Sequence, residues 1–521
     1  MWKASESRTR ATIALAAVVC IAVMMLTVGV SASATARAAP TPPQPSASGA
    51  AEVNSQFVQY GAGSHTYVVK PNGHDDTADI QAAFNACTSS VRTCTVQLEK
   101  GTYHTAQVTV NGFQGSFVGA GQGWTVIQAL PNLPPPGAAY NTASTPFWAG
   151  TPGPSNPWPV LFTFVGGTFS VSGMTVTEPY TNPIASPGWY WDPDLPAGVT
   201  ATDLYALIIV TGGQANAAFD HVTVIGAGGD LSSPLGTPST FNLADGIVYE
   251  GMLLPTGWTS AWGDQIPLSG TFSLTHSLLN RSISAVWVQN LLNATVVVAS
   301  NSIQSAVSQG FFDVSNSQLY FVGNSFTNIM YGAAVDGIQS FYKTDLLPST
   351  VYVVGNSIAV NWEGSGAFFY DFGVPSTLSA VISGNTVESD NSCGCYTWEA
   401  SASVGGESLN SLVVTGNRIL GGGTGIEIAI GPGVAVGNTV IGADVGVGIY
   451  GGIGALVSGN LIKNSSTWGI AVQTVLGTPI NNRIVGNWIS NSGAYDLYWD
   501  GTGTGNVWIG NVYGTSSPPG L

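Results

Sequence analysis

The sequence predicts an all-β solenoid, in which short parallel strands are stacked coil upon coil. The main evidence is a Gly-Asn dipeptide followed by an alternating apolar run, with 21 to 32 residues between successive glycines. A second apolar strand recurs between these dipeptides, as in Gly425-Ile426-Glu427-Ile428. Periods of 20 to 50 residues that contain several short strands are typical of solenoids. The dipeptides are Gly323-Asn324, Gly355-Asn356, Gly384-Asn385, Gly416-Asn417, Gly437-Asn438, Gly459-Asn460, Gly486-Asn487 and Gly510-Asn511.

The dipeptide itself indicates a parallel β-helix. A coil of about 22 residues holds three strands and three turns, and its inward Ile, Val and Leu side chains stack on the next coil about 4.8 Å away. Glycine permits the bend. The asparagine amides can stack as a ladder that satisfies buried backbone groups at the turn, so we assign these asparagines no catalysis. A β-propeller is the rival architecture, but its blades run to about 40 residues.

The composition limits the partners of the chain. Of 521 residues only 8% are charged, and the formal net charge is −16. Four of the 12 basic and one of the 28 acidic residues lie in the N-terminal leader, so the remainder carries −19. Such a surface repels phosphate backbones, which argues against nucleic acid. Cations, neutral glycans and cell-wall material stay compatible with this charge.

The N-terminal 39 residues have the pattern of a secretory signal peptide. Lys3, Arg8 and Arg10 precede an apolar run, and Ala36-Arg37-Ala38 supplies a cleavage pattern. An uncleaved membrane anchor is the alternative, because the run is long enough to span a bilayer. We therefore expect a secreted, extracellular protein. The further expected segments are a Pro/Ser/Ala-rich linker at 40–56, a β-helix at 57–515 with insertions at about 130–200 and 250–268, and a tail at 516–521.

One helix is expected at the start of the solenoid. Asp75 to Phe84 carries an apolar stripe, with Asp76 as its cap. A strand at Thr95–Leu98, a turn at Lys100–Tyr103, and a strand and turn at Phe117–Gly121 follow. This order resembles the start of secreted right-handed parallel β-helix proteins of the pectin-lyase-like superfamily. The resemblance implies a single-stranded right-handed β-helix whose N-terminal helix covers the open end, where an uncovered edge would aggregate.

Four cysteines lie outside the leader. Cys87 and Cys94 flank a short loop after the predicted helix, and in an exported protein we expect them to form a disulfide. Cys393 and Cys395 are separated by one residue. Their pairing would close a strained ring, and a soft-metal site is the alternative.

The segment from about 130 to 200 is rich in aromatic residues and interrupts the repeat. Trp189 and Trp191 are its candidates for substrate binding, because exposed rings can stack on sugars, and long loops in a compact fold are usually functional. The alternative is that these rings cover the solenoid wall as a local core.

Strand alternation supplies the other candidate site residues. Ile426 and Ile428 point inward, so Glu427 points outward, and the same reasoning turns Val248, Trp287, Asp313, Gln339, Tyr450 and Tyr498 outward on one sheet. A row of aromatic rings and carboxylates suits a glycan groove. The substrate-binding candidates there are Trp287 and Tyr450, and Glu363 lies near the same face. The catalytic candidates are Asp245, Asp313, Asp336, Asp371 and Glu427.

Coil spacing makes the catalytic prediction geometric. Carboxylates on adjacent coils stand about 5 Å apart and those two coils apart nearly 10 Å, which correspond to retaining and inverting glycosidases. Asp313, Asp336 and Asp371 are expected on three successive coils. The acid would need a raised pKa. Each carboxylate could instead be a solvated turn or wall residue, and a cluster could bind Ca²⁺.

Asn242-Leu243-Ala244-Asp245-Gly246 is similar to the Asn-Thr-Asp-Gly motif of polygalacturonases, which implies a catalytic role for Asp245. The chain departs from that family because no Asp-Asp pair, His-Gly or Arg-x-Lys follows. Pectate lyases need a basic residue beside Ca²⁺, and the coils hold few basic residues. A neutral glycan fits this charge balance better.

Three functions remain open on sequence alone. The first is a glycoside hydrolase acting on polysaccharide, without a cofactor unless Ca²⁺ is used. The second is a glycan-binding or surface protein without catalysis. The third is a lyase or epimerase of uronate polymers. We expect a monomer whose partner is a polysaccharide or cell-wall glycan, with no nucleic acid and no membrane contact once the leader is cleaved.

Overall fold

A computed structural model describes most of the chain beyond residue 57. The described residues are 58–59, 65–89, 93–130, 160–178, 206–226, 245–253, 265–282, 284–305, 308–329, 335–339, 346–360, 365–389 and 402–521. They all belong to one compact unit, Asn54–Leu521. The expected signal peptide and most of the expected linker fall outside them. Among the described residues, no helix has both the length and the apolar character needed to cross a membrane.

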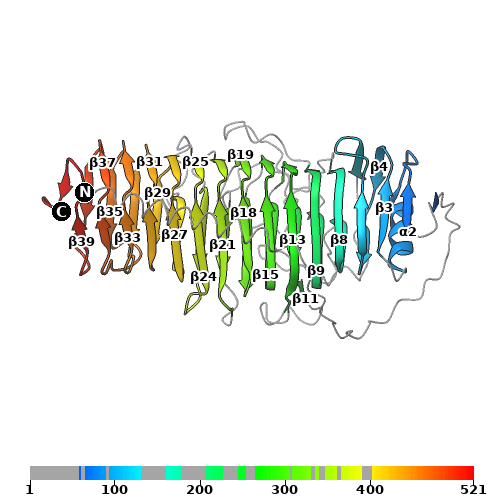
Figure 1. Cartoon of the computed structure of the whole chain (residues 1–521), viewed down its shortest axis with the longest axis horizontal. Coiled ribbons are helices and arrows are strands. Elements are labelled where there is room, and N and C mark those ends of the chain that lie inside the picture. The colour runs from blue at the N-terminus through cyan, green and yellow to red at the C-terminus, as the bar shows by residue number, and fades with distance from the viewer. Residues whose placement is uncertain are drawn as a thin grey trace, which may run out of the picture. The chain divides into compact units, whose positions relative to one another are not determined.

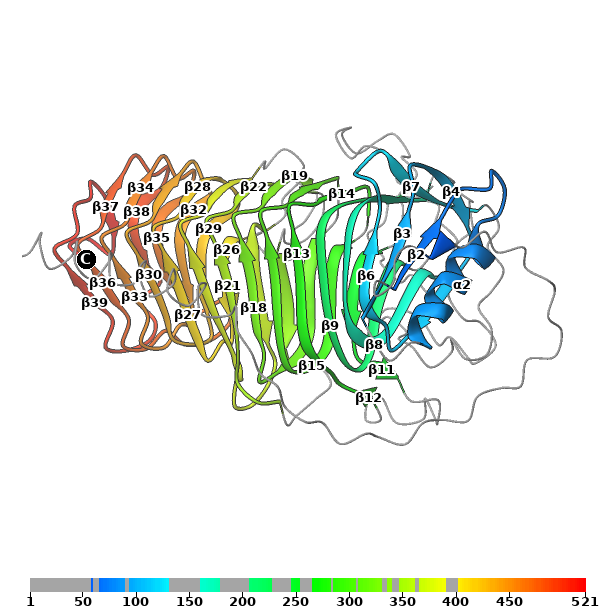
Figure 2. The same ribbon diagram turned by 45° about the vertical axis from the view of Figure 1, so that its right-hand side comes forward.

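Each coil adds one strand to each of three parallel sheets, here named A, B and C (Figures 1 and 2). In one coil, β29 (Thr424–Ala429) belongs to sheet C, β30 (Gly433–Val436) to sheet A and β31 (Thr439–Ile441) to sheet B. The chain then returns to sheet C as β32 (Val445–Tyr450), whose first residue pairs with Thr424.

Three strands are long enough to pass through more than one sheet. These are β8 (Val160–Thr177), β9 (Ala206–Ile225) and β15 (Ser284–Ala299). The other strands of sheet A are β2 (Thr66–Val69), β3 (Cys94–Leu98), β6 (Gln114–Val118), β13 (Leu268–Thr275), β18 (Gln318–Val322), β21 (Ser349–Val354), β24 (Leu378–Ser383), β27 (Ser411–Thr415), β33 (Leu456–Ser458), β36 (Arg483–Val485) and β39 (Val507–Ile509).

The remaining strands complete sheets B and C. Those of sheet B are β4 (Gly101–Thr105), β7 (Thr125–Ala129), β14 (Leu278–Asn280), β16 (Ser302–Gln304), β19 (Ser325–Ile329), β22 (Ser357–Val360), β25 (Thr386–Ser389), β28 (Arg418–Gly421), β34 (Leu461–Lys463) and β37 (Trp488–Ser490). Those of sheet C are β5 (Val108–Asn111), β10 (Asp245–Glu250), β17 (Ser308–Ser315), β20 (Val335–Gln339), β23 (Ala367–Asp371), β26 (Ala402–Glu407), β35 (Trp468–Gln473), β38 (Tyr495–Trp499) and β40 (Ser516–Ser517).

Two short pairings lie outside the three ladders. Strand β1 (Val58–Gln59) runs antiparallel to β2, and β11 (Met252–Leu253) runs antiparallel to β12 (Gln265–Ile266). Strand β40 pairs with β38 and lies within the segment expected to be a tail. That segment therefore extends sheet C.

The core is a set of aliphatic and aromatic columns inside the three sheets. In sheet A, Phe321, Val353, Ile382 and Val414 lie opposite one another on successive coils and are all fully buried. Parallel strands at this spacing, joined by short connections through the other two sheets, form a right-handed parallel β-helix. The predicted fold is confirmed.

The predicted amide ladder is present. The side-chain oxygen of Asn438 accepts hydrogen bonds from the backbone N–H and the side-chain Nδ2 of Asn417, at 2.9 and 3.0 Å. The Nδ2 of Asn417 also donates to the carbonyl of Ile382 at 2.9 Å. The same pattern repeats from coil to coil between Asn301 and Asn511. These asparagines therefore have a structural role.

The ladder reaches one coil further than the dipeptide shows, because Ser300 replaces glycine before Asn301. Ser300 has φ of 58°, close to the 62° of Gly323 on the next coil. Glycine tolerates this left-handed conformation best, but other residues can adopt it at a cost. A search for Gly-Asn alone misses this coil.

The helix α2 (Thr77–Thr88) covers the N-terminal end of the stack (Figures 1 and 2). Its buried face includes Ile80 and Phe84, and the Phe84 ring contacts Phe113 and Phe117 at centroid distances of 5.1 and 5.0 Å. Burial of this apolar face stabilises the cap. The predicted closing role of the helix is confirmed.

Asp76 is the N-cap residue of α2, as predicted, but its carboxylate makes no hydrogen bond to the helix. It accepts instead from the backbone N–H groups of Asn72 and His104. The N–H of Thr77 is satisfied by Asp75 instead. The turn predicted at Lys100–Tyr103 is wrong, because Gly101 to Tyr103 belong to strand β4, which pairs in register with β7.

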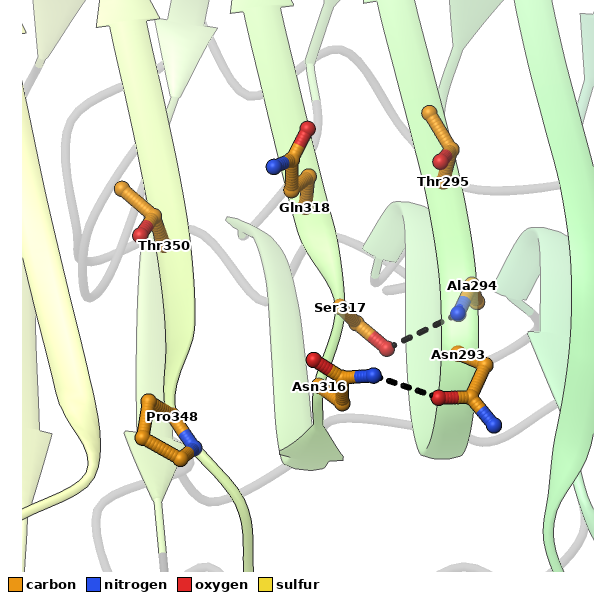
Figure 3. Close-up of a pocket in the computed structure, with 8 residues that line it drawn as sticks. All are labelled: Asn293, Ala294, Thr295, Asn316, Ser317, Gln318, Pro348 and Thr350. Atoms are coloured by element: carbon orange, nitrogen blue, oxygen red, sulfur yellow. Dashed lines mark hydrogen bonds between the residues drawn. The ribbon is translucent and has the colours of Figure 1, made fainter.

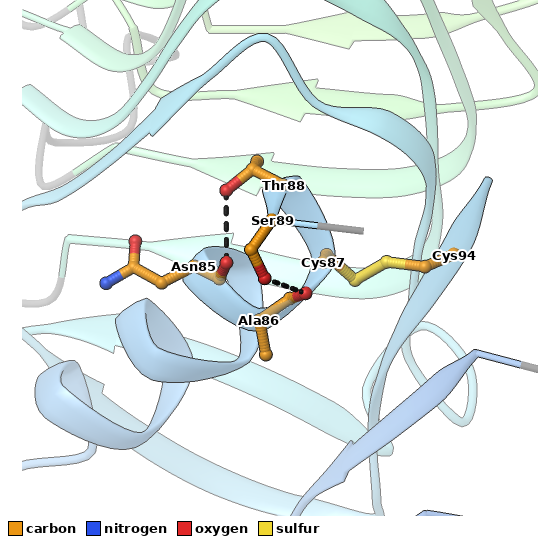
Figure 4. Close-up of a disulfide and its surroundings, with 6 residues drawn as sticks. All are labelled: Asn85, Ala86, Cys87, Thr88, Ser89 and Cys94. Atoms are coloured by element: carbon orange, nitrogen blue, oxygen red, sulfur yellow. Dashed lines mark hydrogen bonds between the residues drawn. A yellow bond between two sulfur atoms is a disulfide. The ribbon is translucent and has the colours of Figure 1, made fainter. Parts of the chain in front are cut away.

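The disulfide between Cys87 and Cys94 is formed, and it joins the end of α2 to the start of β3 (Figure 4). The two Cα atoms are 5.7 Å apart, within the usual range for a disulfide. The bond therefore ties the cap to the first coils. Cys393 and Cys395 lie outside the described residues.

Candidate functional site

The outer face of sheet C carries a row of residues in register, one from each coil. Strand alternation turns them away from the core. The row contains Glu427, which was predicted to face outward on this sheet, and Asp336, a further catalytic candidate. In order it runs Ile209, Val248, Trp287, Gly310, Asp336, Phe368, Gly405, Glu427, Gly448, Ala471 and Tyr498.

Asp336 is the carboxylate with the most unusual surroundings. Its Oδ1 atom is buried and has no hydrogen-bond partner among the described residues. A side chain at Gly310, on the preceding coil, would meet both Asp336 Oδ1 and the Trp287 ring. The carboxyl and the indole therefore converge over this glycine. Burial raises the pKa of the Asp336 carboxyl to about 7, because a desolvated carboxylate favours its neutral form.

Trp287 faces outward as predicted, but it is only 8% exposed. It packs in an apolar cluster with Val248 and Phe312, with the Phe312 ring centroid 6.0 Å away. Its indole N–H donates to Gln289 at 3.2 Å. Within the described structure Trp287 desolvates its neighbours and offers little surface for stacking.

Glu427 and Tyr450 also face outward and are also mostly buried, at 7% exposure each. The Tyr450 ring lies over Gly448, the residue beside Glu427 on the next coil. The Tyr450 hydroxyl lies 3.3 Å from that of Thr424. Burial raises the pKa of Tyr450 to about 12. This pair is a second place where a ring fills the space above a glycine.

Gln339 and Asp313, which were predicted to face outward, do not join the row, and neither does the catalytic candidate Asp371. Gln339 points inward, and its amide bonds the N–H and the carbonyl of Val314. Asp313 has a left-handed backbone, with φ of 47°, and is buried. Asp371 is buried and accepts hydrogen bonds from the backbone N–H groups of Thr377 and Leu378 at 2.5 and 2.8 Å. Alternation itself turns Gln339 and Asp371 inward, because each lies three positions after an outward residue, Asp336 or Phe368. The prediction gave Gln339 the wrong face.

The expected pairing of carboxylates on neighbouring coils is not formed by these residues. Asp313, Asp336 and Asp371 do lie on successive coils, but Asp336 stands opposite Gly310 and Phe368. Asp371 stands opposite Gln339 instead. Glu427 is three coils from Asp336 in the row, about 14 Å at the usual strand spacing. Neither glycosidase spacing reaches that far.

Several sequence candidates cannot be placed. The backbone of Asp245 begins β10 and pairs with Ala206, but its side chain is outside the described residues. Trp189, Trp191 and Glu363 are also outside them.

Basic residues are absent from the described strands of sheet C. Arg418 and Lys463 lie in sheet B, and Arg483 lies in sheet A. Arg281 has a left-handed backbone just after β14. The described part of the row therefore offers no cation to an anionic polymer.

Sequence reasoning missed a polar pocket beside sheet A, at the turn from sheet C (Figure 3). Its volume is about 400 Å³, and neutral side chains line it, including Asn293, Asn316, Gln318 and Thr350. Asn316 donates to Asn293 at 2.6 Å across two coils. A run of Asn, Ser, Gln and Thr at coil turns was the only signal, and such residues are common in turns.

Two stacked tyrosines stand beside this pocket. Tyr320 and Tyr352 lie opposite each other on the outer face of sheet A, with ring centroids 4.8 Å apart and planes 5° apart. The Tyr320 hydroxyl donates to Gln318, which also lines the pocket. Amide, hydroxyl and aromatic groups together can bind a neutral sugar.

Comparisons with known proteins support the fold. No protein-family model matches the sequence, and no curated protein matches it. Pre-mature gene product 12 of bacteriophage phi29 is 12% identical with a TM-score of 0.51, over 85% of this chain and 55% of that one. The catalytic unit of a GH87 alpha-1,3-glucanase from Streptomyces thermodiastaticus is 15% identical with a TM-score of 0.43, over 89% and 71%.

A mannuronan C-5 epimerase A-module from Azotobacter vinelandii is 13% identical with a TM-score of 0.39, over 86% of this chain and 97% of that one. The likeness to the phi29 protein agrees with the right-handed parallel β-helix that the strand register shows. At these identities the likeness concerns the fold alone, because one fold carries many functions.

Proposed function

We propose that this protein is a secreted glycoside hydrolase that acts on a neutral polysaccharide, with Asp336 as the proton donor. The observation that carries the proposal is the placement of Asp336 on the outer face of sheet C, against Trp287 and with a buried oxygen. A carboxyl with a pKa of about 7 is still protonated near neutral pH. It can therefore donate a proton to a leaving glycosidic oxygen.

A glycosidase needs a second carboxylate. Glu427 is too distant for that role. The Asp371 carboxylate binds backbone N–H groups of a turn, and Asp313 does not lie in the row. In sequence, Glu363 lies in the connection that leads into β23, the strand paired with β20, which carries Asp336. We assign the second role to Glu363, as base or nucleophile.

The neutral substrate follows from charge. The described strands of sheet C hold no Arg or Lys, and the chain has a formal net charge of −16. A uronate polymer would bring further carboxylates to this surface and meet repulsion. The same absence weighs against a lyase or an epimerase. Secretion is supported by the apolar leader and its cleavage pattern.

The test is hydrolysis of a panel of neutral polysaccharides, measured as new reducing ends. Asp336→Asn and Glu363→Gln should each lower the rate by at least about 100-fold, since a general acid or base contributes 10² to 10⁴. Asp444→Asn is the matched control, because Asp444 is an exposed carboxylate in a turn. The proposal fails if the wild-type protein releases no reducing ends from any neutral glycan, or if Asp336→Asn keeps full activity.

A second candidate function is glycan binding without catalysis, favoured by the polar pocket beside Tyr320 and Tyr352. Affinity electrophoresis in glycan-containing gels tests it. The double variant Tyr320→Ala, Tyr352→Ala should lose retention, whereas Asp336→Asn should keep it. Retention of the wild-type protein without new reducing ends would favour this function over hydrolysis.

A further inference from the structure

Asp220, His221 and His276 meet at the corner between sheets A and B, far in the fold from the row on sheet C. Asp220 and His221 lie on one coil and His276 lies on the next, because Asp220 pairs with Thr275. His221 Nδ1 is 2.8 Å from Asp220 Oδ2, and His276 Nδ1 is 2.9 Å from Asp220 Oδ1. The two imidazole rings stack with centroids 5.1 Å apart.

These distances suit a shared metal ion. Zinc binds histidine nitrogen and carboxylate oxygen at about 2.0 to 2.2 Å, which places two ligand atoms of a tetrahedral site about 3.4 Å apart. The three side chains each offer one ligand atom, and these atoms all lie within 4.8 Å of one another. Small side-chain rotations would therefore complete the site. All three side chains are at least half exposed, so water can fill the remaining coordination positions.

The carboxylate of this group is positioned by its neighbours. One of its oxygens lies within hydrogen-bond distance of His221 Nδ1 and the other within that of His276 Nδ1. The Thr275 hydroxyl also donates to Asp220 Oδ1, at 2.7 Å, and orients it. Carboxylate oxygen and imidazole nitrogen occur together as ligands in zinc sites.

The backbone at both histidines gives an independent reason to look for a function. His221 and His276 have left-handed φ angles of 52° and 48°. In the same column, the coil before His221 holds Gly173 and the coil after His276 holds Ser300, with φ of 66° and 58°. Glycine would serve the turn with less strain. The conformation of the turn therefore gives no reason for histidine at this position on two adjacent coils. Backbone strain of this kind is concentrated at functional sites.

We propose that Asp220, His221 and His276 bind one transition-metal ion of the Zn²⁺ type, which links two successive coils. Imidazole ligands favour Zn²⁺, Cu²⁺ and Ni²⁺ over Ca²⁺ and Mg²⁺. Between His221 and His276 the chain makes a full coil that contains two segments outside the described residues, 227–244 and 254–264. An ion that joins both ends of this long coil would offset part of its closure entropy.

The experiment is titration of the full, tag-free secreted protein with ZnCl₂ by isothermal calorimetry, with thermal unfolding measured in parallel. We expect one ion per chain and a rise in the unfolding temperature. His221→Gly and His276→Gly should each weaken binding by at least about 100-fold, more than the loss of a supporting partner would. Both variants should fold, because Gly173 and Gly323 take this conformation in the same column.

His74→Gln is the control, because His74 is exposed and lies outside the group. It should bind Zn²⁺ as the wild type does. Replacement of Zn²⁺ by Co²⁺ adds a spectroscopic readout, since nitrogen ligation changes the visible absorption of Co²⁺. The proposal is overturned if the wild-type protein shows no saturable Zn²⁺ binding. It is also overturned if both glycine variants bind as tightly as the wild type, because the ion then lies elsewhere.

Discussion

Replacement of Asn417 by alanine should destabilise the β-helix far more than the same change at the end of the ladder. Asn417 lies in the middle of the amide ladder and is 2% exposed. Its Oδ1 accepts from the backbone N–H and the Nδ2 of Asn385, both at 2.9 Å. Its own Nδ2 donates to the carbonyl of Ile382. Asn417→Ala removes all three partners.

The expected loss of stability is set by the polar groups that Asn417→Ala would leave buried without a hydrogen-bond partner. The N–H and Nδ2 of Asn385 and the carbonyl of Ile382 would remain in the interior without their partner, and Asn385 and Ile382 are at most 1% exposed. Each unsatisfied buried group costs about 1–3 kcal/mol. We therefore expect a loss of roughly 3–6 kcal/mol, toward the lower end if water enters the space.

Asn511 is the matched control, because its side chain makes the same three hydrogen bonds, to Asn487 and Ile484. It lies on the last coil and is only partly buried. Water can replace the lost partner there, so Asn511→Ala should cost about 1 kcal/mol.

Urea unfolding measured by circular dichroism gives the difference between the two variants. Hydrogen exchange at the Asn385 amide gives a local readout, which matters because solenoids can unfold in parts. The reasoning is refuted if Asn417→Ala costs no more than Asn511→Ala, or if exchange at Asn385 is unchanged.

Three further predictions concern the cap, the core and the candidate acid. Cys87→Ser should lower the stability of the N-terminal cap by roughly 2–3 kcal/mol, as expected for a loop of this length, and urea midpoints with and without a reductant would show it. Gly337→Ala should lower the free energy of unfolding by about 1–3 kcal/mol through overpacking, because the new methyl group would meet the Phe311 ring. At Gly323 an added methyl group has open space, so Gly323→Ala should lower it by about 1 kcal/mol, through backbone strain alone. Burial raises the pKa of Asp336 to about 7 from 3.8, so between these pH values the folded state binds more protons at this carboxyl than the unfolded state does. The stability of the wild type should therefore fall relative to that of Asp336→Asn as the pH rises from 4 to 7. Unfolding measured at several pH values tests this.

The parts of the fold that depend on local pattern could be predicted from the sequence. Alternation at Ile426, Glu427 and Ile428 gave the correct inward and outward faces, because a strand of sheet C has a side-chain period of two. The Gly-Asn turns predicted the ladder, because glycine adopts the left-handed backbone of the turn and the asparagine amide can both donate and accept hydrogen bonds. The ladder turn at Ser300-Asn301 was not predicted, because serine replaces glycine there.

The errors lie at strand ends. Gln339 and Asp371 are the last residues of β20 and β23, and their side chains satisfy backbone groups of the turn that follows. Asp336 and Phe368 face outward, so alternation turns Gln339 and Asp371, three positions further on, inward. The sequence did not show which phase of the alternation faces the core, because both phases of these short strands contain apolar residues.

The site could be predicted only in part because its geometry depends on register between coils. Asp336 and Trp287 are separated by 49 positions in sequence and meet over Gly310 because three successive coils align. The two histidines of the proposed metal site are also brought together by pairing, between Asp220 and Thr275. Coils of unequal length hide this alignment from any count along the sequence.

The row on sheet C shows how a solenoid can desolvate a carboxylate on its outer wall. Side chains on adjacent coils stand about 4.8 Å apart, so a residue beside a carboxylate normally fills its own place. At Gly310 that place is empty, and the Trp287 ring occupies it from one coil further away. At Gly448, which stands beside Glu427, the Tyr450 ring fills the empty place, and Tyr450 lies two residues further along the same strand. A glycine in the row thus leaves room for an aromatic ring beside a carboxylate. At Asp336 burial disfavours the charged carboxylate and raises its pKa.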